Sequence, residues 1–185
     1  GDDSVDGGSG DDTLGRAIGS ADPERSDGSD TMNGGEGNDT ITGDRGADLL
    51  SGGDGDDSIS AGSSDDTVDG GTGNDTLYGG AGANTLDYSL RSSSVTIDLG
   101  TGSATDAGTM ANIKRVVGGA GVDTLVGPDE ANSWNLDGND AGSVGGVAFA
   151  AIENAAGGAE SDRFVFTAEG ALRGIVTGGS GDDFL

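Results

Sequence analysis

Aspartate recurs at every ninth residue in the first half of the sequence. Six consecutive segments share one nine-residue frame: 34–42, 43–51, 52–60, 61–69, 70–78 and 79–87. The sixth place of this frame holds Asp, or Asn in the last segment, and the eighth place holds Ile, Leu or Val. Carboxylates at this spacing, among glycines that leave carbonyl oxygens exposed, could bind a hard cation, because calcium takes oxygen ligands. The pattern therefore predicts a series of metal sites.

The frame also defines the candidate ligands, since it fits residues 1–15 and 25–33 and returns at 118–126 and 178–185. Ala21, Asn84 and Asn132 stand where the frame expects Asp, so calcium sites there are predicted to be weak or empty. The turn carbonyls predicted to bind calcium are those of Gly35, Gly37, Gly53, Gly55, Gly71 and Gly73. The carboxylates predicted to bind it are Asp3, Asp12, Asp30, Asp39, Asp48, Asp57, Asp66, Asp75, Asp123 and Asp183.

Each nine-residue segment is predicted to form a turn followed by a very short strand. In Thr76-Leu77-Tyr78 only the middle side chain would point inward, because side chains alternate along a strand. One inward residue per strand suits the thin interior of a coil in which each turn is made from two segments. Successive coils would then stack about 4.8 Å apart, at the spacing of paired strands.

Stacking would bring together aspartates that are two frames apart in the sequence. Two carboxylates about 5 Å apart repel by roughly 3 kcal/mol at an effective dielectric constant of about 20, so the stack needs a divalent cation between its turns. We interpret 16–24 as one degenerate repeat that keeps the register, with Ala21 and Pro23 in the Asp and apolar places and Ile18 turned inward. The pairs expected to be intact are Asp12–Asp30, Asp30–Asp48, Asp48–Asp66, Asp39–Asp57 and Asp57–Asp75.

Composition excludes several classes of function. The chain has no Cys and no His, which removes thiol and imidazole nucleophiles and the usual zinc ligands. A net charge of -26 over 185 residues repels nucleic acid and anionic membranes and attracts hard cations. No apolar run approaches the roughly 20 residues that a membrane helix needs. We therefore expect neither a nucleic-acid partner nor a membrane span.

The segments resemble the calcium-binding RTX nonapeptide, G-G-x-G-x-D-x-U-x, closely over residues 1–87. The resemblance implies an all-β fold, a right-handed parallel β-roll or β-solenoid, with several calcium ions in its turns. It also implies that the Asp side chain and turn carbonyls of one repeat share calcium with the repeat one coil away. Proteins of this family are typically exported by Gram-negative bacteria through type I secretion, which implies an extracellular or cell-surface location.

A slower repeat follows residue 87. "GGAGANTL" (79–86) recurs as "GGAGVDTL" (118–125) and again as "GGAESDRF" (157–164), each 39 residues later. We therefore divide the chain into a calcium roll at 1–87 and a continued β-solenoid at 88–185, built on units 79–117, 118–156 and a partial 157–185. The continued solenoid is predicted to have wider coils. Four aromatic residues are expected to fill its interior: Trp134, Phe149, Phe164 and Phe166.

These features favour a non-catalytic, calcium-dependent structural segment of a large secreted or cell-surface protein, such as an adhesin, surface-layer component or filament. Its partners would be calcium and neighbouring repeats or copies in a surface assembly. The alternative is an accessory module of a secreted protease, lipase or polysaccharide epimerase, which would aid secretion or substrate binding. A carboxylate-based glycosidase is a third hypothesis, but calcium binding already accounts for the regularly spaced carboxylates.

Overall fold

The computed structural model describes residues 2–15 and 28–185. Contacts divide the chain into two compact units, Gly1–Leu86 with Asp106–Ile113 and Asp87–Thr105 with Lys114–Leu185. We call them the N-terminal and the C-terminal unit. All regular elements in the described residues are strands, so the predicted all-β fold class is confirmed. In this described part of the chain, no helix is long and apolar enough to cross a membrane.

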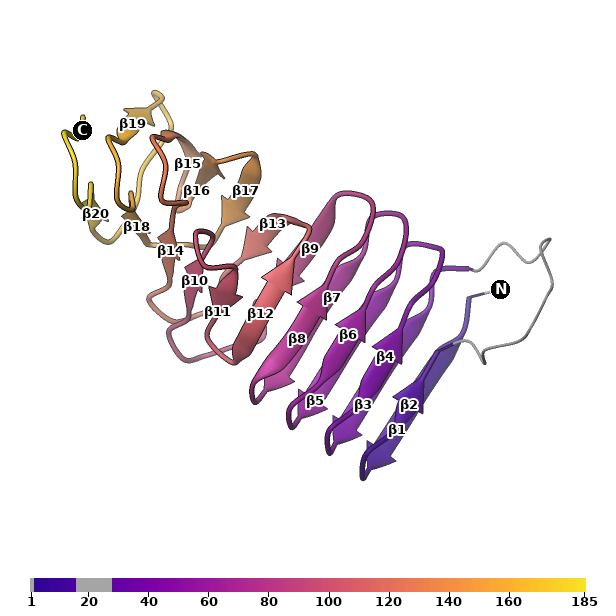
Figure 1. Ribbon diagram of the computed structural model, residues 1–185. Helices are drawn as coiled ribbons and strands as arrows, with labels where there is room; N and C mark the ends of the chain where they lie inside the picture. Colours follow the sequence, from indigo (N-terminus) through magenta and orange to yellow (C-terminus); the bar gives the residue numbers. More distant parts are fainter. Residues whose placement is uncertain (1, 16–27) are drawn as a thin grey trace. The chain divides into compact units, whose positions relative to one another are not determined.

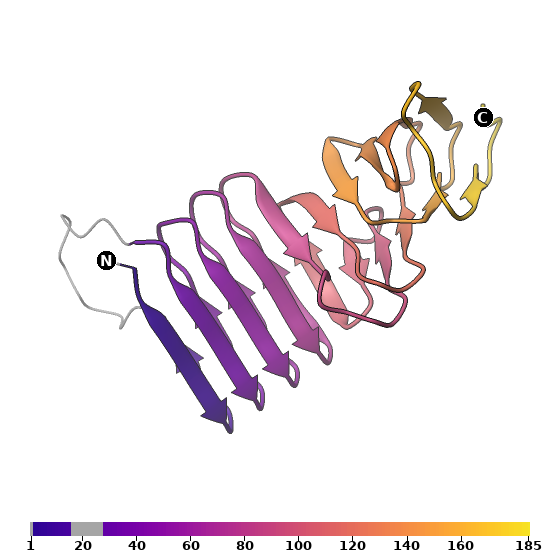
Figure 2. The same ribbon diagram turned by 180° about the vertical axis from the view of Figure 1, so that it is seen from behind.

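The N-terminal unit consists of very short strands that alternate between two sheets. One sheet has the order β1-β3-β5-β7-β9 and the other β2-β4-β6-β8-β12, and neighbouring strands within both run parallel. Figure 1 and Figure 2 show these strands as successive rungs in two layers. The strands are β1 Ser4–Ser9, β2 Thr13–Leu14, β3 Thr31–Glu36, β4 Thr40–Thr42, β5 Leu49–Asp54, β6 Ser58–Ser60, β7 Thr67–Thr72, β8 Asp75–Tyr78, β9 Asn84–Asp87 and β12 Ala107–Ala111.

The strand register follows the nine-residue frame. Leu50 of β5 lies beside Val68 of β7, and Ile59 of β6 lies beside Leu77 of β8, so one coil takes 18 residues in this part of the unit. The eighth-place side chains form the core, because each is the apolar residue of its strand that points inward. These buried residues are Leu14, Met32, Ile41, Leu50, Ile59, Val68, Leu77 and Leu86. A coil of two nonapeptides with one aliphatic layer explains how so glycine-rich a chain can fold.

One coil is longer than predicted. Thr13 of β2 lies beside Thr40 of β4, and Val5 of β1 lies beside Met32 of β3, so both partners are 27 residues apart. This coil therefore contains one nine-residue frame more than a regular coil. The interpretation of 16–24 as a repeat that keeps the regular spacing is wrong in this respect. The inward Ile18 lies outside the described residues.

The C-terminal unit continues two sheets with strands of less regular spacing. Its strand orders are β13-β17-β16-β15-β19 and β11-β10-β14-β18-β20. Parallel partners are 30 residues apart in Trp134↔Phe164 and in Leu125↔Ala155. The strands are β10 Thr96–Asp98, β11 Ser103–Ala104, β13 Ile113–Val117, β14 Thr124–Val126, β15 Ser133–Gly138, β16 Ala141–Val144, β17 Val147–Ala150, β18 Asn154–Ala156, β19 Arg163–Phe166 and β20 Val176–Thr177.

Parallel partners in this unit are further apart in sequence than the 18 residues of a regular coil, so its coils contain extra residues. They form an antiparallel meander, β15-β16-β17, which returns twice within one sheet. Strands also recur at 39-residue spacing, as in β14 and β19, which begin at Thr124 and Arg163. A local excursion of this kind lengthens the repeat and leaves the parallel stack beside it in place.

Aromatic residues fill the interior of the C-terminal unit, with one exception. The Trp134 ring stacks on Phe164 with centroids 5.2 Å apart and meets Phe149 edge-on at 6.0 Å. All three side chains are buried. Phe166 is 46% exposed, so its predicted place in the core is wrong. It lies two residues after Phe164 but at the end of β19, where the alternation of buried and exposed side chains stops.

Candidate metal centres

The sixth-place aspartates form two ladders, one along each edge of the N-terminal unit. In each ladder the backbone N–H of one Asp donates to Oδ1 of the next, for example from Asp39 to Asp57 at 2.8 Å. This bond uses one carboxylate oxygen to hold neighbouring coils in register. The first ladder runs Asp12, Asp39, Asp57, Asp75, and the second runs Asp3, Asp30, Asp48, Asp66, Asn84.

Four of the expected pairs are therefore neighbours, and the doubtful Asp66–Asn84 pair is present as well. The expected Asp12–Asp30 pair is wrong. Asp12 donates to Asp39 at 2.7 Å and Asp3 donates to Asp30 at 2.8 Å, both across 27 residues. The long coil moves Asp12 to the opposite edge from the one predicted. Ala21, the degenerate sixth place, lies outside the described residues.

The second carboxylate oxygen of these aspartates faces inward. The Oδ2 atoms of Asp12, Asp39, Asp57 and Asp66 are buried and accept no hydrogen bond from any described residue. A buried carboxylate oxygen without a donor is costly, because burial removes its water and nothing replaces it. A proton or a cation bound at these oxygen atoms would remove this cost.

The first-place glycine of each repeat leaves the space that such a cation could use. A Cβ atom at Gly34 would collide with Oδ2 of Asp39 and with the carbonyl oxygen of Gly52, one coil further on. A Cβ atom at Gly52 would likewise collide with Oδ2 of Asp57 and the carbonyl oxygen of Gly70. We call this space, bounded by a sixth-place carboxylate and the next coil's first-place carbonyl, the oxygen cradle.

Asn84 has a hydrogen-bond donor at the place where the Asp repeats have a second acceptor oxygen. Its Nδ2 donates a hydrogen bond to the carbonyl oxygen of Asn112 at 3.3 Å, and a Cβ atom at Gly79 would collide with both atoms. An amide can satisfy the carbonyl directly, whereas a carboxylate places a second acceptor against it. The Asp cradles contain oxygen atoms only, and such a donor set fits calcium.

The predicted turn carbonyls point from coil to coil. A Cβ atom at Gly53, where φ is 112°, would strike the carbonyl oxygen of Gly35, and one at Gly55 would strike that of Gly37. The carbonyls of Gly53 and Gly55 face Gly71 and Gly73 in the same way. For the carbonyls of Gly71 and Gly73 the pairing of β7 with β9 gives no such neighbour, since it covers Thr67↔Thr85 and Val68↔Leu86.

The fifth-place residues form a further ladder, which we did not predict from the sequence. Fifth-place Asp and Asn side chains accept the backbone N–H of the fifth place one coil on, for example from Asn38 to Asp11 and from Asp56 to Asn38, both at 2.8 Å. These residues are exposed, unlike the sixth-place Asp39 and Asp57. The signal was present, because the fifth place holds Asp or Asn in several repeats: Asp11, Asn38, Asp56, Asp65 and Asn74. Here Asx side chains cap the turn without needing a metal.

Burial changes the acidity of two sixth-place carboxyls. It raises the pKa of Asp57, and the neighbouring charges of Asp39, Asp56 and Asp54 raise it further, while the backbone N–H of Asp39 lowers it. Burial also raises the pKa of Asp66, against a lowering by the backbone N–H of Asp48. The negative form of both groups is therefore disfavoured where no cation is bound.

The candidate sites of the C-terminal unit are built differently. Oδ1 of Asp123 accepts the N–H of Val95 at 2.8 Å, and its Oδ2 accepts the N–H of Gly119 at 2.7 Å. The amide of Asn132 donates to the carbonyl oxygen of Pro128 at 2.9 Å. Asp183 accepts the N–H of Asp162 at 2.9 Å through Oδ1. Asp123 thus accepts from protein donors, and Asn132 donates to a carbonyl oxygen, where the N-terminal unit leaves oxygens facing each other.

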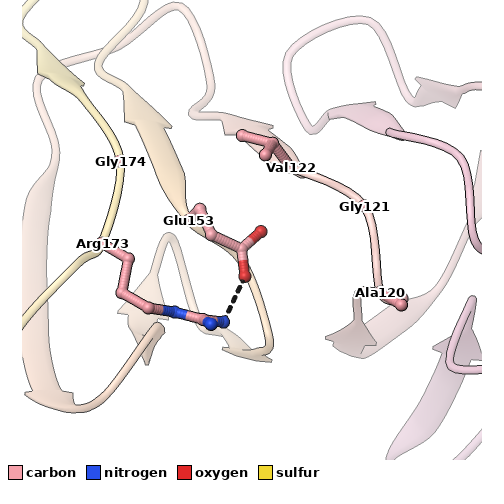
Figure 3. A pocket seen from close by; sticks show the side chains of 7 residues that line it. Ala120, Gly121, Val122, Glu153, Arg173 and Gly174 are labelled. Carbon is pink, nitrogen blue, oxygen red and sulfur yellow. Dashed lines mark hydrogen bonds and ion pairs between the residues drawn. The ribbon is translucent and has the colours of Figure 1, made fainter.

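A largely exposed arginine side chain neutralises two buried acidic groups of this unit. Arg173 donates to Oε1 of Glu153 at 2.7 Å and to Oδ2 of Asp140, and both acidic side chains are buried. Figure 3 shows Arg173 and Glu153 joined in a pocket that Ala120, Gly121 and Val122 also line. The hydrogen bond from Arg173 to Asp140 and the attraction of both acids raise the pKa of the guanidinium, which stays charged. The sequence offered no period that would reveal this cluster.

In the described residues no three acidic side chains gather into one metal-binding cluster. Each cradle of the N-terminal unit instead combines one carboxylate with backbone carbonyls. This arrangement is present at Gly34 and Gly52 on one edge and at Gly43, beside Asp48 and the carbonyl oxygen of Ala61, on the other.

Comparison with known families agrees with this geometry. The family model of the RTX calcium-binding nonapeptide repeat (4 copies) matches residues 1–15, 25–59 and 60–89. No curated protein matches the chain. The match covers the two aspartate ladders and ends before the C-terminal strands, and RTX nonapeptide repeats bind several calcium ions. Residues 1–15, 25–59 and 60–89 therefore carry the RTX calcium-binding nonapeptide repeat.

Proposed function

We propose that this chain is a non-catalytic structural segment whose N-terminal unit folds and stiffens when calcium binds between its stacked turns. The ligands in this proposal are the sixth-place carboxylates and the turn carbonyls that face them. When bound, calcium supplies the positive charge that the paired oxygens lack. The observation that carries the proposal is the buried Oδ2 of Asp39 and of Asp57, each placed against a carbonyl oxygen of the next coil.

The residues themselves divide the work. Oδ1 of each sixth-place Asp fixes the register between coils, as in the 2.9 Å bond from the N–H of Asp57 to Asp75. The eighth-place aliphatics form the core, and the first-place glycines keep the cradle open. Because each coil contacts mainly its neighbours, stiffening would extend along the stack one coil at a time.

A segment of this kind suits the extracellular part of a large secreted or cell-surface protein, of adhesin, surface-layer or filament type. Calcium is abundant outside the cell, so the segment would fold only after it has been exported. The net charge of -26 supports this setting, because calcium screens an acidic surface that would otherwise repel itself. No catalytic role is proposed, since the frame carboxylates already bond to the neighbouring coil.

The test is circular dichroism of the intact chain in a calcium chelator and after addition of millimolar calcium, with magnesium as the control. The expected result is a weak β signal in chelator and a full β signal in calcium. Magnesium should substitute poorly, because it demands tighter octahedral geometry. A full β signal in chelator, or equal action of magnesium, would overturn the proposal.

A further inference from the structure

The turn at residues 118–122 lacks a partner of equal length in the next coil. Val117 pairs with Ala150, and the N–H of Asp123 donates to Oε2 of Glu153 at 2.8 Å. The later coil therefore crosses this edge in fewer residues than the turn contains. A pocket of about 490 Å³ lies beside the turn, within the range of about 300–1,000 Å³ that is usual for small-molecule sites.

Polar side chains from the following coils form the opposite wall of this pocket. Figure 3 shows Glu153 and Arg173 across from Val122, and all the lining residues belong to the C-terminal unit. The Arg173 side chain is 73% exposed, and its Nε and Nη2 donate to Asp140 and Glu153. Its Nη1 donates to none of the residues that the structure describes. The guanidinium therefore keeps hydrogen-bond donors for a ligand.

Glu153 offers acceptors next to these donors. Its side chain is buried, and it accepts from Arg173 through Oε1 and from the N–H of Asp123 through Oε2. A carboxylate oxygen has two lone pairs, so each Oε atom can accept one further hydrogen bond. Donors and acceptors thus lie side by side in this wall. A ligand group that both donates and accepts hydrogen bonds would satisfy both.

Charge narrows the class of ligand. The two carboxylates of Asp140 and Glu153 share the single guanidinium of Arg173, and the whole chain carries a net charge of -26. This excess of negative charge repels anions. A cation would in turn have to approach the exposed guanidinium. A neutral ligand that carries several hydroxyl groups meets neither obstacle, because each hydroxyl group both donates and accepts hydrogen bonds.

We propose that this pocket binds a neutral saccharide of one or two sugar units. Nη1 of Arg173 donates to a hydroxyl oxygen of the sugar, and Glu153 accepts a hydrogen bond from a neighbouring hydroxyl group. The side chain of Val122 is 57% exposed and gives the C–H groups of the sugar ring an apolar surface. This site goes beyond the proposed calcium-dependent role, since no residue of the two aspartate ladders takes part in it.

Saturation-transfer difference NMR on the intact chain in saturating calcium tests the site, with lactose, maltose and sucrose as neutral probes. At least one of them should take up saturation from the wild type. Arg173→Lys keeps a positive charge beside the two acids but loses the Nη1 donor. It should bind the same sugar at least about tenfold more weakly, because hydrogen bonds from charged groups are strong. Arg163→Lys is the matched control at an exposed arginine outside the pocket and should bind as the wild type does.

Ala120→Phe provides a second variant, which narrows the pocket and leaves the ion pairs in place. Ala120 is exposed and lines the pocket, so this variant should fold and should also bind the sugar more weakly. Trp134 is the only tryptophan, and its emission shows whether each variant keeps its core. If Arg173→Lys has lost the buried emission, Ala120→Phe decides. The absence of saturation in all three sugars, or undiminished binding by the folded variants, would refute the site.

Three further probes test the class of ligand. Glucuronate carries a negative charge, glucosamine carries a positive charge, and tetraglycine is a peptide. Each should bind more weakly than the neutral sugar, and stronger binding of any one would show that the assigned class is wrong. Circular dichroism in chelator and calcium tests the proposed function separately, because the aspartate ladders lie in the N-terminal unit and the pocket in the C-terminal unit.

Discussion

The side-chain amide of Asn84 donates to the carbonyl oxygen of Asn112, in the same place where Asp57 presents Oδ2 to the carbonyl of Gly70. One cradle is thus closed by a hydrogen bond and the other by two facing acceptors. Because Gly79 and Gly52 hold the same place of the frame, the two turns allow a comparison between a site closed by a hydrogen bond and a site that we propose to be closed by calcium.

This comparison predicts different effects for two substitutions of Asp57. Asp57→Ala removes the acceptor of the Asp39 N–H and leaves that buried donor unsatisfied, at a cost of about 1–3 kcal/mol. Asp57→Asn keeps the acceptor and adds a donor for the carbonyl of Gly70. In calcium titrations followed by circular dichroism, Asp57→Ala should raise the folding midpoint more than Asp57→Asn. An equal or larger rise in Asp57→Asn would contradict the equivalence of the two turns.

The first place of the repeat permits a reciprocal experiment. Gly52→Ala should weaken calcium binding, because the added Cβ would occupy the cradle of Asp57. Ala61 is the natural alanine in this place, and Asp66 follows it at the sixth place with a buried Oδ2 that has no hydrogen-bond donor among the described residues. Ala61→Gly should therefore strengthen binding at Asp66, although glycine costs up to about 1 kcal/mol in flexibility. Isothermal titration calorimetry with calcium would show whether the two changes have opposite signs.

The pH dependence in chelator follows from the raised pKa values of Asp57 and Asp66. Each group binds its proton more tightly in the folded than in the unfolded chain. The stabilising effect of protonation is therefore complete below the unfolded pKa, about 3.9, and is lost as the pH rises through the raised value. In chelator, β structure should increase as the pH falls towards that range. A decrease in the circular dichroism signal over the same range would contradict this prediction.

The long coil predicts that one nine-residue frame can be removed without loss of the roll. Asp12 bonds to Asp39 across 27 residues, whereas regular neighbours such as Asp39 and Asp57 are 18 apart. Deleting residues 16–24 would give Asp12 and Asp39 the regular spacing and keep them on the same edge. The calcium midpoint for folding should stay the same or fall. A marked rise would show that the deleted residues support the first coils.

The features that could be predicted from the sequence are those that recur at a fixed nine-residue spacing. The nine-residue frame was sufficient for the short strands, the core at Leu50 and Leu77, and the stacking of Asp39 on Asp57. It failed at Asp12, because an extra nine-residue segment leaves the frame intact while it moves every earlier residue to the other edge. A nine-residue period in the sequence does not reveal how many repeats one coil contains.

The C-terminal unit was harder to predict because its partners have no common spacing. Arg173 meets Glu153 across 20 residues and Asp140 across 33, so no periodic search would join them. Asp162 was part of a recognised repeat, "GGAESDRF". The sequence did not show that its Oδ2 lies near the carbonyl oxygen of Gly178, because only the fold brings the two together. From the sequence we therefore noted only that this unit has fewer aspartates in the frame. The neutralisation of its buried acids by Arg173 was not predicted.

The last prediction concerns Arg173, whose guanidinium forms ion pairs with two acidic side chains of the C-terminal unit. Asp140 and Glu153 are buried, and Arg173 donates to both. Arg173→Ala would leave two buried carboxylates without their cation, so the unit should unfold at a lower urea concentration, as followed by Trp134 emission. Added calcium should partly restore the midpoint, because a divalent ion can replace the guanidinium between two carboxylates. Arg163→Ala is the control, since Arg163 is exposed on β19 and should change the midpoint little. If Arg173→Ala unfolds at the wild-type urea concentration, the C-terminal unit does not depend on this ion pair, and another feature must explain how it keeps two buried acids.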